Sequence, residues 1–98
     1  MPQVLQTPRA RADLVEILIY IGQNNPSAAD RFAGLIDQKC QLLAEFPLLG
    51  PACDELAVGL RYFTAGNYVI FYKPTDLGIQ VIRILHGARD LPAIFQSE

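Results

Sequence analysis

Residues that could carry chemistry gather near the C-terminus, in the stretch VIRILHGARDLPAIF (residues 81–95). It holds the only histidine of the chain, His86, with Arg83 before it and the pair Arg89–Asp90 after it. A histidine beside arginines can act as a general acid or base next to cations that stabilise a developing negative charge. A structural interpretation is also open, in which His86 ends a strand and Asp90 caps a short helix.

The arginines in the expected strands, Arg61 and Arg83, need either a partner or an exit to solvent. In an ideal strand, Arg83 shares one face with apolar residues such as Ile79. A buried arginine requires a carboxylate within the fold or cover from another chain. Alternatively, its aliphatic stem packs while the guanidinium reaches solvent. Arg89, at a strand–helix junction, is a candidate for binding an anion or a carboxylate.

Tyrosines in the expected strands, Tyr62, Tyr68 and Tyr72, are of the type that stacks on nucleic-acid bases. Such stacking platforms are accompanied by a basic stripe, whereas this chain has a net charge of −2. We therefore expect packing roles for these rings and no direct nucleic-acid binding.

The cysteines and histidine exclude the common zinc patterns. Cys40 and Cys53 are not in a CxxC arrangement, and one histidine cannot complete a site with them. We expect no metal, no cofactor, and two reduced thiols in a cytoplasmic protein. No apolar run approaches the roughly 20 residues of a membrane span, so no membrane contact is expected.

The N-terminal half predicts a strand and two helices. Gln3–Gln6 alternates as an edge strand does, and Thr7 with the following proline is typical of a helix start. The apolar spacing places Asp13 off the buried face of that first helix, which is formed by Leu14, Ile17, Leu18 and Ile21.

A second helix should follow at once. Ser27 and Asp30 resemble a capping box at its start, and it should end near Phe46, because Pro47 disfavours helix in the residue before it. The short connection predicts an antiparallel helical hairpin.

Beyond residue 58 the pattern indicates strands at Gly59–Thr64, Tyr68–Lys73 and Ile79–His86, joined by short turns. The third is apolar on both faces, so we expect it to be central and covered on both sides. A short helix should begin near Asp90. The predicted fold class is α+β, with an N-terminal edge strand, an antiparallel helical hairpin, a three-stranded antiparallel meander and a short C-terminal helix, forming one domain over residues 1–98.

Four segments together resemble the RelE/ParE superfamily of bacterial type II toxins, and the ParE branch most closely. They stand in family order and at family spacing over nearly the whole chain: ARADLVEILIY (10–20), AEFPLLGPACDEL (44–56), GLRYFTAGNYVIFYK (59–73) and VIRILHGARDL (81–91). The resemblance implies the same fold as the residue pattern predicts.

The resemblance also implies an activity. RelE-like members cleave mRNA on the ribosome, whereas ParE-like members poison DNA gyrase. Where RelE-like members carry an arginine on the middle meander strand and a C-terminal tyrosine, this chain carries Val69 and Phe95. The expectation is a gyrase inhibitor that acts by protein–protein contact and has no catalytic residues. Two alternatives are an mRNA endonuclease using Arg61, His86 and Arg89, and an inactive binding module of the same fold.

A partner follows from the resemblance as well. ParE-like toxins, associated with plasmid stabilisation, are held inactive by a ParD-like antitoxin whose C-terminal segment folds along the helical hairpin and the sheet. We expect a heterotetramer or a larger assembly. The candidate partner-binding residues are Arg61, Tyr62, Arg83, His86 and Arg89.

Overall fold

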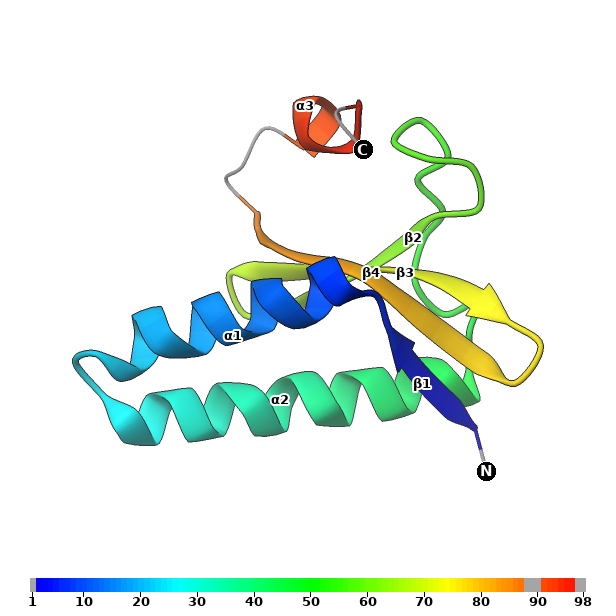
Figure 1. Cartoon of the computed structure of the whole chain (residues 1–98). Helices are drawn as coiled ribbons and strands as arrows, with labels where there is room; N and C mark the ends of the chain where they lie inside the picture. Colours follow the sequence, from blue (N-terminus) through cyan, green and yellow to red (C-terminus); the bar gives the residue numbers. More distant parts are fainter. Residues whose placement is uncertain (1, 88–90, 97–98) are drawn as a thin grey trace.

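The computed structural model describes residues 2–87 and 91–96 (Figure 1). The elements in chain order are β1 (Gln3–Gln6), α1 (Pro8–Gly22), α2 (Pro26–Glu45), β2 (Arg61–Ala65), β3 (Tyr68–Thr75), β4 (Gly78–His86) and α3 (Leu91–Gln96). This order confirms the predicted α+β class and each of its expected parts. None of the described helices is long and apolar enough to cross a bilayer.

The four strands form one sheet in the order β1-β4-β3-β2. β1 pairs with β4 in parallel, while β3 is antiparallel to both β4 and β2. The predicted edge position of the first strand and central position of the last strand are therefore confirmed. Figure 1 shows α1 and α2 side by side on one side of the sheet, with α3 and the loop before β2 on the opposite side.

Each face of the sheet carries its own apolar cluster. Against the helical hairpin, Ile70 and Tyr72 of β3 pack with buried residues of α1 and α2. On the other face, Phe71 and Leu85 pack with Leu60 and with residues of α3. Neighbouring residues of β3 thus point to opposite faces, as strand geometry requires.

A β-bulge interrupts this alternation in β4. Phe71 of β3 pairs with Arg83, but the next residue, Tyr72, pairs with Val81, so Ile82 has no partner on β3. The face pattern of β4 consequently shifts by one residue, and Val81 and Ile84 both lie in the helix-side cluster. Strict alternation would put Arg83 on the same face as Ile79 and Val81. The bulge breaks this alternation, so the prediction that Arg83 shares their face is wrong.

The start of α1 follows the prediction, whereas the start of α2 does not. Thr7 caps α1, and its Oγ1 accepts a hydrogen bond from the Ala10 N–H at 3.0 Å. The cap of α2 is Asn25 instead of the expected Ser27, and its Oδ1 accepts from the Ala28 N–H at 3.1 Å. The physical reason is the proline after Asn25, which suits the first helical position because it lacks the N–H that would be unsatisfied there.

The strands differ slightly in extent from the prediction. β2 begins two residues later than expected, since Gly59 adopts a φ of +79° that no regular strand accommodates. β3 continues through Pro74 to Thr75. The second helix ends at Glu45 as expected, and the Phe46 N–H donates to the Leu42 carbonyl to close its last turn.

The two cysteines lie in different clusters, as free and buried thiols. Cys40 belongs to the helix-side cluster and Cys53 to the cluster under α3. Burial raises the pKa of Cys40 to about 11, aided by the nearby Asp37 charge. Both side chains therefore serve as small core residues at neutral pH.

Candidate functional site

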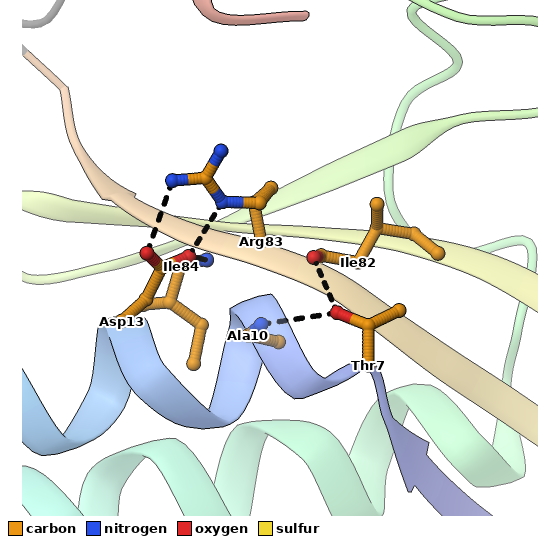
Figure 2. Close-up of polar contacts among 6 residues, drawn as sticks. All are labelled: Thr7, Ala10, Asp13, Ile82, Arg83 and Ile84. Carbon is orange, nitrogen blue, oxygen red and sulfur yellow. Dashed lines mark hydrogen bonds and ion pairs between the residues drawn. The ribbon is translucent and has the colours of Figure 1, made fainter. Parts of the chain in front are cut away.

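A buried ion pair joins α1 to β4. The carboxylate of Asp13 accepts hydrogen bonds from Arg83 Nε at 2.7 Å and from Arg83 Nη2 at 3.0 Å. The same carboxylate accepts the backbone N–H of Ile84 at 3.0 Å. Figure 2 shows the Asp13 side chain extending from α1 toward the Arg83 guanidinium and the Ile84 N–H. Only 6% of the Arg83 side chain and 10% of the Asp13 side chain are exposed.

This pair completes a sheet edge that β1 leaves open. β1 pairs with Gly78–Val81, and none of the described strands pairs with the second half of β4 on that side. Thr7, just before α1, hydrogen-bonds the backbone of β4 there instead. The Thr7 N–H donates to the Val81 carbonyl at 3.0 Å. Figure 2 shows the second bond, in which Thr7 Oγ1 donates to the Ile82 carbonyl at 2.8 Å. Asp13 then continues the row at Ile84. Buried backbone groups need hydrogen-bond partners, which explains why residue 7 is a threonine and residue 13 an aspartate.

Two sequence-based expectations are corrected here. Asp13 was placed off the buried face of the first helix, but it is 9% exposed and faces the sheet. The alternative in which the Arg83 guanidinium reaches solvent is wrong, because Arg83 is 5% exposed and bonds Asp13. The open option of a carboxylate partner within the fold is the one that the structure confirms.

Arg61 holds the loop that follows α2. Its Nη1 donates to the Gly50 carbonyl at 2.7 Å and to the Leu48 carbonyl at 3.3 Å. From the sheet, the buried Tyr72 hydroxyl donates to the Pro47 carbonyl at 2.8 Å and accepts the Gly50 N–H at 2.9 Å. Burial raises the pKa of Tyr72, against smaller lowering effects of the Gly50 hydrogen bond and the Arg61 charge.

This anchored loop presents apolar side chains to solvent. Phe46 is 57% exposed, Leu48 is 70% exposed and Leu49 is 48% exposed. Leu42, one turn earlier on α2, is exposed as well. We call these four residues the apolar loop surface. Because hydrogen bonds from Arg61 and Tyr72 hold its backbone, the surface is presented without a large ordering cost on binding.

The outer side of α1 presents a second apolar surface. Val15 is 50% exposed, and it lines a groove with Gln6, Pro8, Arg11, Ala12 and Glu16. One turn further on, Ile19 is 59% exposed. Residues four apart are neighbours on a helix surface, so Val15 and Ile19 form one exposed apolar patch.

The remaining predicted residues lie apart. Tyr62 is half-buried and packs in the cluster under α3 with Val69. Phe95 of α3 packs edge-on against Phe71, with ring centroids 4.9 Å apart. His86 is exposed, and its ring meets Tyr68 edge-on at 5.2 Å. Arg89, and the expected helix cap Asp90, lie outside the described residues.

Arg61 and His86 do not converge. Arg61 is opposite Tyr72 and His86 is opposite Tyr68, four positions apart along β3. At a rise of about 3.3 Å per residue, the two ends lie roughly 13 Å apart along the strand. Arg61 also points its guanidinium at the loop after α2. Neither the Asp13–Arg83 contact nor the Tyr72–loop contact was predicted from the sequence. The available signal for the first was the spacing of Asp13 from Ala10 and Ile17, which are both buried.

The same fold occurs in a solved toxin–antitoxin structure. The chain matches part of the chromosomal ParDE TA system from P. aeruginosa with a TM-score of 0.73. The match covers 88% of this chain and 96% of that chain at 21% sequence identity, so it shows the fold alone.

Sequence comparison identifies the family. The chain is 39% identical to Toxin RelE2 of Caulobacter vibrioides over 91% of this chain and 99% of that protein. It is 33% identical to Toxin ParE1 of Mycobacterium tuberculosis, over 89% of this chain and 91% of that toxin. The family model described as "ParE toxin of type II toxin-antitoxin system, parDE" matches residues 4–91. The chain therefore belongs to the ParE toxin family of type II toxin–antitoxin systems.

Proposed function

We propose that this toxin inhibits DNA gyrase by protein–protein contact and does not cleave RNA. The observation that carries the proposal is the engagement of the strand arginines within the fold. Arg83 is bonded at two points to Asp13, and Arg61 bonds two loop carbonyls. Metal-free RNA cleavage needs cations directed at the phosphate that reacts, together with a proton shuttle. These guanidinium groups are directed elsewhere.

The residues at the positions of the RelE-like arginine and tyrosine support the same proposal. Val69 and Phe95 both pack in the apolar cluster under α3. Neither side chain has an ionisable group, so neither can take part in general acid–base chemistry. The endonuclease alternative has one observation in its favour, since His86 is exposed and borders a cleft.

We infer further that a ParD-like antitoxin neutralises the toxin by covering its exposed apolar side chains. The apolar loop surface and the outer side of α1 are the two faces that it would cover, and both present large aliphatic or aromatic groups. An antitoxin segment that folds on binding has to bury a large surface to offset its ordering entropy. Two such surfaces on one small domain provide it, in a heterotetramer or a larger assembly.

Expression of the toxin without an antitoxin tests the proposal in cells. The proposal predicts growth arrest with gyrase-dependent DNA breaks and intact mRNA by primer extension. His86→Ala should leave the mRNA pattern unchanged. Ribosome-dependent cleavage that disappears in His86→Ala would instead establish the endonuclease, and unimpaired growth would favour an inactive binding module.

A further inference from the structure

A cleft rich in aromatic rings lies at the end of the molecule where α1 meets the β2–β3 turn. Two adjoining hollows share the residues Tyr20, Tyr68 and His86. The first hollow, of about 200 Å³, is also lined by Glu16. Asn67 of the β2–β3 turn lines the second. We call this the aromatic cleft. Neither the gyrase proposal nor the antitoxin proposal assigns it an occupant.

The rings of the cleft are arranged edge to face. Phe32 of α2 meets Tyr68 with centroids 5.1 Å apart, and Tyr68 meets His86 at 5.2 Å. These contacts fix the wall formed by Tyr68, while Tyr20 is 71% exposed on α1. A ring face carries partial negative charge and attracts cations within about 6 Å of its centre.

The charges around the cleft favour a cation as well. Asp13 lines the first hollow, but Arg83 already compensates that carboxylate. Glu16 lies one turn further along α1, is exposed, and has no ion-pair partner within residues 2–87 and 91–96. The cleft therefore combines aromatic rings with one exposed carboxylate and a neutral amide at Asn67.

We propose that the aromatic cleft receives an arginine side chain of a bound partner protein. A flat guanidinium stacks on tyrosine faces and gives two parallel hydrogen bonds to a carboxylate, whereas an ammonium group does neither as well. The Glu16 carboxylate supplies the acceptors, and Tyr20 and Tyr68 supply the faces. The proposal rests on the proposed function only in that the toxin acts by docking other proteins.

The test uses isotope-labelled toxin titrated with N-acetyl-arginine amide and followed by NMR. The expected result is a saturable shift of resonances confined to Glu16, Tyr20, Tyr68 and His86. The neutral isostere N-acetyl-citrulline amide should bind weaker by about threefold to tenfold, as loss of an exposed ion pair and a cation–π contact predicts.

Two variants sharpen the result. Glu16→Gln should weaken arginine binding by about threefold, while Glu45→Gln, on an exposed carboxylate at the end of α2, should leave it unchanged. Equal binding of arginine and citrulline, an unaffected Glu16→Gln, or no localised shift would each overturn the proposal. Because the probe contains no gyrase or antitoxin, failure of gyrase inhibition would leave this result standing, and the reverse also holds.

Discussion

Asp13 and Arg83 are 70 residues apart in the chain and meet as a two-point ion pair, with Nε–Oδ2 at 2.7 Å and Nη2–Oδ1 at 3.0 Å. The pair fixes the position of α1 on β4, since the same carboxylate also bonds the Ile84 N–H. A buried pair of this kind contributes little compared with an apolar replacement of equal volume. Removal of one of the two charged side chains, however, leaves the other charge buried without compensation.

Asp13→Asn should therefore lower the free energy of unfolding by about 3–5 kcal/mol, measured by urea denaturation. Asparagine keeps an oxygen that can accept the Ile84 N–H, so the effect isolates the charge. Glu16→Gln, on the exposed side of the same helix, should change stability by less than about 0.5 kcal/mol. Asp13→Asn with Arg83→Met should be more stable than Asp13→Asn alone. A double variant less stable than the single one would contradict this account.

Tyr72→Phe removes the hydroxyl that bridges Pro47 and Gly50. The Gly50 N–H is then left buried without an acceptor, so stability should fall by about 1–3 kcal/mol. Amide exchange at Gly50 should accelerate in the same variant. Tyr20→Phe serves as the control. Because Tyr20 is 71% exposed, removal of its hydroxyl should change stability little. Equal stabilities of the two variants would refute the bridging role.

Gly50→Ala and Gly34→Ala should change stability in opposite directions. A Cβ at Gly50 would clash with the Tyr62 carbonyl oxygen and lie 2.6 Å from the Tyr72 hydroxyl. The loop must move, which breaks the anchoring hydrogen bonds. A Cβ at Gly34, inside α2, meets nothing within 4 Å, and the variant should gain about 0.5–1 kcal/mol because alanine favours helix. Thermal unfolding of both proteins measures the contrast, and destabilisation by Gly34→Ala would run against it.

The stability of the protein should depend on Cys40 at alkaline pH. Burial raises the pKa of this thiol from its ordinary value of 9.0 to about 11. Below pH 9 the Cys40 thiol is protonated in both the folded and the unfolded chain, so burial of the neutral thiol contributes fully to stability. Between about pH 9 and 11 the unfolded chain releases its proton first, which favours unfolding. The urea midpoint of the native chain should fall more steeply over this range than that of Cys40→Ala. Parallel curves would show that Cys40 titrates normally.

The elements of the fold were predictable because their signals are local. Thr7 and Pro8 mark a helix start in the sequence, and Phe46 before Pro47 marks a helix end. The central place of β4 followed from its apolar residues on both faces. The cap of α2 was misplaced by two residues because Ser27 and Asn25 are both good caps, and only the proline between them decides.

The contacts at the site were harder to predict because they depend on tertiary geometry. Asp13 falls three residues after Ala10 and four before Ile17, both of which the structure buries. The apolar spacing of Leu14, Ile17, Leu18 and Ile21 had instead placed Asp13 on another face of the helix. The partners that make a buried aspartate favourable, the Ile84 N–H on the edge of β4 and the Arg83 guanidinium, lie about 70 residues away in the chain and become neighbours only in the folded protein. The bulge at Ile82, which redirects Arg83, has no signal in a single sequence.

The central claim is that this ParE-family toxin acts on gyrase through protein contact. A supercoiling assay with purified toxin and DNA gyrase tests it most directly. The account predicts that excess toxin inhibits supercoiling and produces DNA breaks that require gyrase. Unimpaired supercoiling without gyrase-dependent breaks, at toxin excess, would contradict it.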